Sequence, residues 1–249
     1  MRVILLSIAF APERILHLHY QQVYSTIGLR PDRHLVLNNH YPVAEDQVTK
    51  AARVIAKQYD AEFFDVGKNL GSAAGYNLLF QYAAPADDDI VILLDPDTNP
   101  VTPDWGKAMV DVHMAEKKVA WVSTTFPQVD KEFSERKHKE YEVAGYRVLE
   151  PTETMINSIC SFKTKVVREI GGFYDATPWY GGFEAMMWNK IQGKYKWLFL
   201  KDYKEAADPR FESDPIYRQY KVELAHKRST KLEFGAWLKQ NNICTKAGK

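Results

Sequence analysis

The sequence predicts an α/β fold in which helices flank a mainly parallel central sheet, and two observations favour it. Short apolar runs typical of buried strands alternate with longer segments whose apolar residues recur at helical spacing. Strands separated by helices favour right-handed crossovers and parallel pairing. The 249 residues are enough for one such domain with a sizeable core, and their composition is ordinary for a globular protein.

The amino-terminal half shows this alternation most clearly. Strands are expected at residues 3–8, 34–37, 62–66 and 90–94, and helices at residues 15–27, 45–59 and 73–82. In a parallel sheet, ligands bind beyond the carboxyl ends of the strands. The segments that reach this edge are polar or contain glycine, namely residues 7–10, 38–39, 67–71 and 95–98. A binding site is therefore expected along this edge.

The second half is less regular. Helices are expected at residues 105–117 and from near Lys165 and Glu184, and strands at residues 119–124, 156–162 and 197–200. Gly171 and Gly172 should end the helix that begins near Lys165. Residues 131–142 are dense in charge and show no apolar face, which predicts an exposed helix or a loop. We interpret residues 1–200 as the main domain and residues 201–249 as a basic extension that wraps its outside.

Charge and cysteine content bear on partners and location. Net charge is +1, yet basic residues from Arg218 onward far outnumber the two acidic ones. This excess suggests a polyanionic partner such as nucleic acid, or simply a solvated tail. Cys160 and Cys244 match no zinc or disulfide pattern, which favours a reducing compartment. The opening apolar run is too short for a signal peptide, and no later run could span a membrane, so a cytoplasmic protein is expected.

The sharpest local signal is the turn Asp95-Pro96-Asp97, which follows the apolar run at residues 90–94. Two carboxylates at the end of a strand make an oxygen site suited to Mg²⁺ or Mn²⁺ bound together with substrate phosphates. The alternative is a proline turn in which the aspartates only cap a loop. A dehalogenase-type phosphatase also places two aspartates after a strand, but Asn99 stands where that family has Thr or Val.

A second signal is the run DVGKNLGSAAGYN, at residues 65–77. It is neither a P-loop nor a dinucleotide fingerprint, because it lacks both Gly-Lys-Ser/Thr and GxGxxG. Its small residues at positions 72–75 allow a helix to approach the sheet or a ligand closely.

These two segments together resemble family 2 glycosyltransferases with the GT-A fold. KNLGSAAGYN and IVILLDPDTNP are similar to that family's Asn-x-Gly and DxD segments, and NSICSFKTKVVREIGGFYD followed by PWYGGFEAMMW is similar to its acceptor-side segments. The resemblance covers roughly residues 1–200 in the family's order. It implies that residues 1–200 bind a nucleotide-sugar and an acceptor, and that Asp97 coordinates Mn²⁺ or Mg²⁺ while Asp95 contacts the ribose or the metal. Asn69 and Gly71 would line the nucleotide pocket, and Asn38 occupies the position that reads the base, with uracil expected.

The resemblance also implies a catalytic base. Glu184 is the candidate, although the family has Glu-Asp where this chain has Phe183-Glu184-Ala185; the alternative is a helix-start glutamate that interacts with the helix dipole. Further implied roles fall on residues near Glu184 and near the carboxyl terminus. Trp179 and Tyr180 offer a platform on which an acceptor sugar or a base could stack, or else they form a local hydrophobic plug. His226 would be an additional metal ligand, and Lys227 and Arg228 would contact phosphate or another polyanion.

The resemblance implies an inverting hexosyltransferase that uses a nucleoside-diphosphate sugar, with UDP-sugar favoured. A sugar-phosphate nucleotidyltransferase is the main alternative, but AFAPERI stands where that class has a glycine-rich, arginine-containing loop. A non-catalytic binding module would be indicated if Glu184 pointed away from the aspartate turn. The acceptor stays open: a glycan, or a modified nucleic acid bound by the basic carboxyl-terminal segment.

Overall fold

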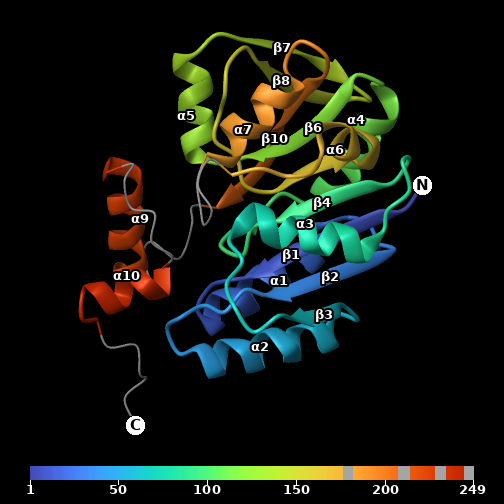
Figure 1. The fold of residues 1–249 in the computed structure, drawn as a ribbon. Coiled ribbons are helices and arrows are strands. Elements are labelled where there is room, and N and C mark those ends of the chain that lie inside the picture. Colours follow the sequence, from blue (N-terminus) through green and yellow to red (C-terminus); the bar gives the residue numbers. More distant parts are fainter. Residues whose placement is uncertain (176–181, 207–213, 228–233, 244–249) are drawn as a thin grey trace.

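A computed structural model describes residues 1–175, 182–206, 214–227 and 234–243. It confirms the α/β class (Figure 1). The strands are β1 (Val3–Ala9), β2 (Arg33–Asn38), β3 (Glu62–Asp65), β4 (Ile90–Leu94), β5 (Asn99–Pro100), β6 (Val119–Thr125), β7 (His138–Val143), β8 (Tyr146–Pro151), β9 (Cys160–Lys163) and β10 (Lys196–Ala206). The helices are α1 (Glu13–Thr26), α2 (Glu45–Gln58), α3 (Ser72–Ala83), α4 (Trp105–Ala115), α5 (Pro127–Glu135), α6 (Thr164–Ile170), α7 (Phe183–Ile191), α9 (Pro215–Lys227) and α10 (Phe234–Gln240).

The sheet has the order β3-β2-β1-β4-β9-β6-β10-β8-β7, and β5 pairs with β10 off this path. Strands β3, β2, β1 and β4 are parallel neighbours, as are β6 and β10. Strand β9 lies antiparallel between β4 and β6, so these two strands still run in the same direction. Along the path only β9 and β8 oppose the common direction. The expected mainly parallel sheet is therefore observed.

Helices cover both faces of the sheet, which is why the central strands are continuous apolar runs rather than alternating ones. In β1, Ile4 and Leu6 belong to one core cluster, together with residues of α3, α5, α6 and α7. The intervening Val3 and Leu5 belong to the cluster on the opposite face, with residues of α1 and α4. Strand periodicity thus sends successive β1 side chains into two separate cores.

The segment at residues 131–142 differs from the expectation of an exposed helix or loop. Its first part ends helix α5, whose Val129 and Phe133 lie four residues apart on one face and are both buried. Its last part forms β7, the edge strand that pairs with β8. The charged segment begins after Val129, so the apolar face of the helix does not show within residues 131–142.

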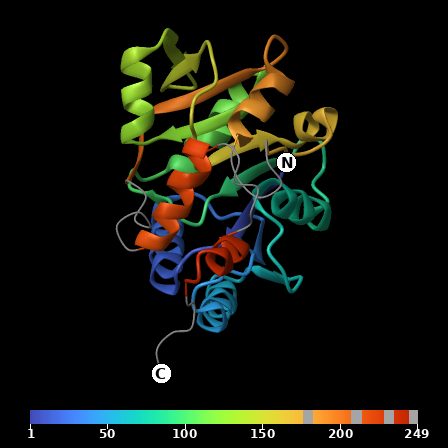
Figure 2. The ribbon, with the colours of Figure 1, turned by 60° about the vertical axis from the view of Figure 1, so that its left-hand side comes forward.

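The strand expected at residues 156–162 begins only at Cys160, and the residues before it form a loop. Strand β10 continues to Ala206 because a register shift after Phe199 lets its last residues pair with β5. Beyond it, α9 and α10 are not merely polar: Tyr217 and Phe234 are buried in a third core cluster with residues of β1, α1 and α2. These two helices lie together at one side of the main body in Figure 1 and in front of it in Figure 2.

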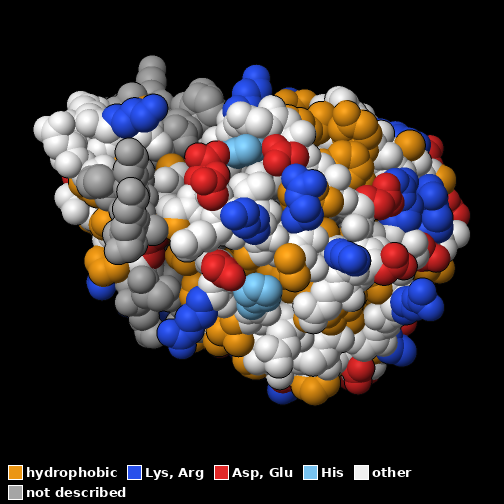
Figure 3. Space-filling model, turned by 90° about the horizontal axis from the view of Figure 1, so that it is seen from below, with side chains coloured by type: hydrophobic (Ala, Val, Ile, Leu, Met, Phe, Trp, Pro, Cys, Tyr) orange, Lys and Arg blue, Asp and Glu red, His pale blue; other side chains and the backbone are white. Residues whose placement is uncertain are grey.

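The surface carries charges of both signs. Figure 3, a view from below, shows Lys and Arg side chains interspersed with Asp and Glu among the described residues of that face. Some of the surface charges form ion pairs: Arg33 Nε, for example, lies 2.7 Å from Glu62 Oε1. No helix in the described part of the chain is both long and apolar enough to cross a membrane.

Candidate active site

A pocket of about 980 Å³, part of it open to solvent, lies beyond the carboxyl ends of β1 and β4. Its lining residues come from β1, the loops after β2, β3 and β4, the loop before β9, and helices α3, α7, α9 and α10. The pocket thus lies where the sequence predicts a binding edge.

The aspartate turn forms one wall of the pocket. Asp95, Pro96 and Asp97 all line it, and Asp97 is buried. The Tyr76 hydroxyl donates to Asp95 Oδ1 across 3.1 Å and also contacts the Leu94 carbonyl oxygen at 3.0 Å. Burial, followed by the charge of Asp95, raises the pKa of Tyr76 well above its usual value, so this hydroxyl remains a donor. The Tyr76 hydroxyl therefore holds Asp95 from α3, and both aspartates of the turn line the pocket.

The glycine loop after β3 forms the neighbouring wall. Asn69 and Gly71 both line the pocket, and Asn69 Oδ1 accepts the Gly71 N–H across 2.8 Å. Asn39 holds the loop from β2, since its Oδ1 accepts the Leu70 N–H at 2.8 Å and its Nδ2 donates to the Gly71 carbonyl at 3.3 Å. Gly71 has φ +79°, which favours glycine at this position.

Asn38 lies outside this pocket. Its amide donates to Thr49 Oγ1 at 3.0 Å and to Asp65 Oδ2 at 3.2 Å, and the next residue, Asn39, lines the pocket instead. Side chains alternate along a strand, so two adjacent asparagines at its end point in different directions. The sequence did not distinguish between them.

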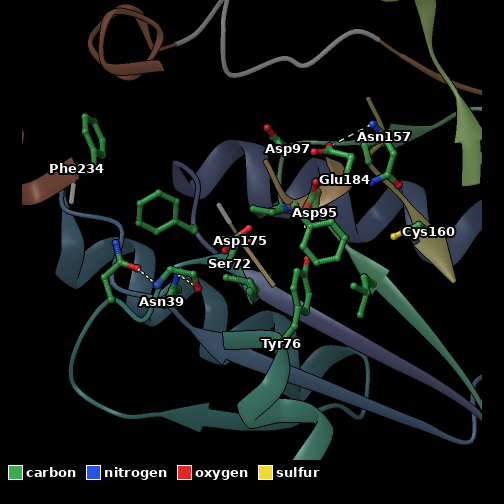
Figure 4. Close-up of a pocket in the computed structure, with 18 of the residues that line it drawn as sticks. Asn39, Ser72, Tyr76, Asp95, Asp97, Asn157, Cys160, Asp175, Glu184 and Phe234 are labelled. Carbon is green, nitrogen blue, oxygen red and sulfur yellow. Dashed lines mark hydrogen bonds between the residues drawn. The ribbon is translucent and has the colours of Figure 1, made fainter. Parts of the chain in front are cut away.

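Glu184 lies in the first turn of α7 and lines the same pocket as Asp95 and Asp97 (Figure 4). Its Oε1 accepts the backbone N–H of Asn157 across 3.3 Å. The Ser123 hydroxyl donates to Asn157 Oδ1 at 3.1 Å, which fixes this residue from β6. The condition that would have indicated a non-catalytic module, a Glu184 turned away from the aspartate turn, is not met.

A buried carboxyl group that no motif marks, Glu205, lies on β10. Its carboxylate accepts from the hydroxyls of Thr124 and Ser158 and from the Ile159 N–H. Burial raises the pKa of Glu205 to about 7, against the opposing effect of these hydrogen bonds. Ser158 lines the pocket, so Glu205 supports the loop that contacts Glu184 from behind. No sequence signal marked this residue, because the register shift in β10 brings it there.

The third wall is aromatic. Phe10, at the end of β1, meets Tyr217 of α9 and Phe234 of α10, with ring centroids 6.2 and 6.5 Å apart, and all three line the pocket together with Tyr220. Such rings offer flat apolar faces to a base or a sugar. The carboxyl-terminal helices therefore contribute to the site that residues 1–200 were expected to hold.

Several expected site residues cannot be placed. Trp179, Tyr180 and Arg228 lie outside the described residues. The backbone of α9 extends through His226 and Lys227, but their side chains also lie outside the described part. Their roles stay predictions.

The donor set at the aspartate turn suits a hard divalent cation. Among the described residues, no group of three or more His, Cys, Asp and Glu side chains could hold a metal ion. Mg²⁺ and similar ions commonly use one or two protein carboxylates and complete their coordination with substrate phosphates and water. Asp95 and Asp97, side by side on one wall, fit that mode of binding.

Three solved structures share this arrangement of elements. The mannosyltransferase PcManGT from Pyrobaculum calidifontis, in complex with GDP-Man and Mn²⁺, matches 98% of the chain with a TM-score of 0.65 at 15% identity, over 69% of its own length. GalNAc-T7, with UDP, GalNAc and Mn²⁺, matches 98% with a TM-score of 0.62 at 12% identity. TarS of S. aureus, in complex with UDP-GlcNAc, matches 83% with a TM-score of 0.55 at 12% identity.

This chain has the GT-A glycosyltransferase fold. It spans 54% of the GalNAc-T7 chain and 58% of the TarS chain. No protein-family model matches the sequence, and no curated protein matches it. The fold that the motifs implied is thus established by structure, at identities too low to carry over an activity.

Proposed function

We propose that the protein is an inverting glycosyltransferase that moves a hexose from a nucleoside-diphosphate sugar to an acceptor hydroxyl. The observation that carries this proposal is the convergence of Asp95, Asp97 and Glu184 on one pocket of a GT-A fold. Segments far apart in the chain contribute these three carboxylates. A turn that could hold a cation and a separate carboxylate would supply two contributions to such a transfer: charge for the leaving diphosphate and a base for the acceptor hydroxyl.

Each wall of the pocket has a part in the proposed reaction. Asp97, with Asp95, would hold Mn²⁺ or Mg²⁺, which neutralises the diphosphate as it leaves. The Asn69–Gly71 loop would hold the nucleotide. Glu184 would remove the proton from the acceptor hydroxyl as that oxygen attacks the anomeric carbon from the face opposite the diphosphate, so the configuration inverts. The Asn157 N–H would orient Glu184 for this step.

Nucleotide binding tests the donor half of the proposal. Calorimetry with UDP, with Mn²⁺ and then with excess chelator, should show binding that depends on the metal; GDP and other nucleoside diphosphates serve as comparisons. Mass spectrometry of products from a panel of nucleotide-sugars then identifies the donor. If no nucleoside diphosphate binds in a metal-dependent way, the proposal is wrong, and phosphate release from a simple aryl phosphate would favour the phosphatase alternative.

For the acceptor we propose a hydroxyl of a glycan, or of a modified nucleic acid held by the basic carboxyl-terminal segment. The second possibility rests on sequence alone. Lys227→Glu, Arg228→Glu and Lys231→Glu, combined in one variant, should abolish transfer to a nucleic acid and leave donor hydrolysis intact. Equal loss of transfer and hydrolysis would instead assign the segment to the donor site or to the fold.

A further inference from the structure

Asp175 is a pocket carboxyl group that the proposed reaction leaves unused. It lies five residues beyond α6, after the Gly171-Gly172 pair, and it lines the pocket beside Ser72 and near Glu184 (Figure 4). Its segment, GGFYD, belongs to the stretch that resembles the glycosyltransferase family, but no sequence pattern gives the aspartate itself a role.

One oxygen of this carboxyl group is firmly held. Asp175 Oδ2 accepts the backbone N–H of Ala73, in the first turn of α3, across 2.7 Å. Helix α3 also holds Phe173, two residues earlier, through Asn77. Asn77 Oδ1 accepts the Phe173 N–H at 2.8 Å, and Asn77 Nδ2 donates to the Phe173 carbonyl at 2.9 Å. A side chain on Gly172 would clash, since its Cβ would lie 2.6 Å from Asn77 Oδ1. The position of Asp175 is therefore set by α3.

The other oxygen has no such contact. Asp175 Oδ1 is buried and has no hydrogen-bond partner anywhere in the described part of the chain. Burial raises the pKa of Asp175 to about 6, and the charge of nearby Glu184 adds to this effect. A buried acceptor without a donor costs free energy, which a bound ligand recovers if it supplies an O–H or N–H group. The pocket thus contains a fixed acceptor that lacks its donor.

We propose that Asp175 is a sugar-binding residue whose Oδ1 accepts a hydrogen bond from a hexose hydroxyl next to the aspartate turn and Glu184. This inference rests on the proposed function. The chemistry of the position selects a hydroxyl, because a carboxylate repels a phosphate and because Oδ2 of Asp175 is already engaged by the Ala73 N–H, which leaves Oδ1 as a hydrogen-bond acceptor. A site built to bind a hydroxyl also rejects the sugar that lacks it, so Asp175 would determine sugar specificity.

The test combines variants with deoxy-sugars. Asp175→Asn keeps an oxygen for the Ala73 N–H but presents an amide to the pocket, and Asp175→Ala removes both oxygens. Asp89→Asn is the matched control, because Asp89 is also buried and accepts backbone N–H groups but does not line the pocket. Wild-type protein should lose roughly 10- to 100-fold in kcat/KM with the one deoxy-sugar whose hydroxyl Asp175 binds. The Asp175 variants should lose a similar factor with the parent sugar and no further factor with that deoxy-sugar.

Two arms identify the source of the hydroxyl. Hydrolysis of nucleotide-sugars without acceptor reports the transferred hexose, and transfer to methyl hexosides and their deoxy forms reports the acceptor. In either arm, a loss with one deoxy-sugar that the wild type shows and the Asp175 variants do not show supports the inference and assigns the sugar.

Equal losses of the Asp175 variants with every analogue and with UDP alone would overturn the inference in favour of a purely structural role. If the wild type turns over nucleotide-sugars but the loss with each deoxy-sugar is the same in the wild type and in the Asp175 variants, this inference alone is wrong. If no nucleotide-sugar is bound or turned over, the proposed function is wrong as well.

Discussion

The backbone N–H of Asn157 donates to Glu184 Oε1 across 3.3 Å, so the loop before β9 is in contact with the first turn of α7. The loop is anchored on both sides of this contact. Ser123 donates to Asn157 Oδ1, and the buried Glu205 accepts from Ser158 and Ile159. The position of the proposed base therefore depends on a polar network between β6, β9 and β10, as well as on its own helix.

Replacing the proposed base should separate chemistry from binding. Glu184→Gln keeps an oxygen for the Asn157 N–H but removes the basic carboxylate. We expect sugar transfer to fall by about 10²- to 10⁴-fold, the usual contribution of a general base, while metal-dependent UDP binding stays within about twofold, a free-energy change below 1 kcal/mol. Steady-state kinetics and calorimetry measure the two quantities. A variant that transfers sugar at the wild-type rate would remove Glu184 from the mechanism.

Asp97 of the aspartate turn should affect metal-dependent nucleotide binding rather than folding. Asp97→Asn removes one charge from the expected cation site, and UDP affinity in Mn²⁺ should drop at least about tenfold, or roughly 1.4 kcal/mol. Titration of UDP at several Mn²⁺ concentrations measures this change. Asp89→Asn should leave the affinity unchanged, because Asp89 pairs with Arg2 away from the pocket. Unaltered metal dependence in Asp97→Asn would contradict the assignment of Asp97 as a ligand.

The sequence predicted what is encoded locally. The strand that ends at Leu94, just before Asp95, and the helix that begins just before Glu184 both follow from apolar runs and their polar ends. The structure brings these ends into one pocket. Residues 38–39 were expected at the binding edge, but no local pattern distinguishes Asn39 from Asn38, and none gives Asp175 or Glu205 a role. The role of Asn39 depends on which side of a strand end faces the pocket. That of Asp175 depends on a buried oxygen with no donor among the described residues, and that of Glu205 on its place in a strand whose register shifts. Each of these is a tertiary relationship with no local pattern.

The carboxyl-terminal helices should be coupled to the pocket through Phe234. This ring is buried, with centroids 5.1 Å from Tyr217 and 4.9 Å from Tyr220. Phe234→Ala removes a packing contribution of about 3–5 kcal/mol. We expect faster hydrogen exchange in α9 and α10, little change in β1 and β4, and a higher KM for the donor. Val222→Ala, at an exposed position of α9, is the control. Unchanged exchange in both helices would show that Phe234 does not hold them.

Glu205 should make stability depend on pH in the direction opposite to that of an ordinary carboxylate. Burial raises its pKa from 4.5 to about 7, so the folded protein binds the proton more tightly than the unfolded chain. The corresponding contribution, about 3 kcal/mol for a shift of this size, is complete below pH 4.5 and is lost as pH rises through 7.

Glu205→Gln removes this titration and keeps a side chain of the same shape. The difference in unfolding free energy between the variant and the wild type should therefore shift in favour of the variant by up to about 3 kcal/mol between pH 5 and pH 8. Urea denaturation at these two pH values measures the shift, and comparison with the wild type cancels the other titrating groups. Glu140→Gln is the control, because Glu140 is exposed and pairs with Lys201 on the surface. A difference between Glu205→Gln and wild type that is the same at both pH values would mean that Glu205 is ionised throughout, held as a carboxylate by the hydroxyls of Thr124 and Ser158.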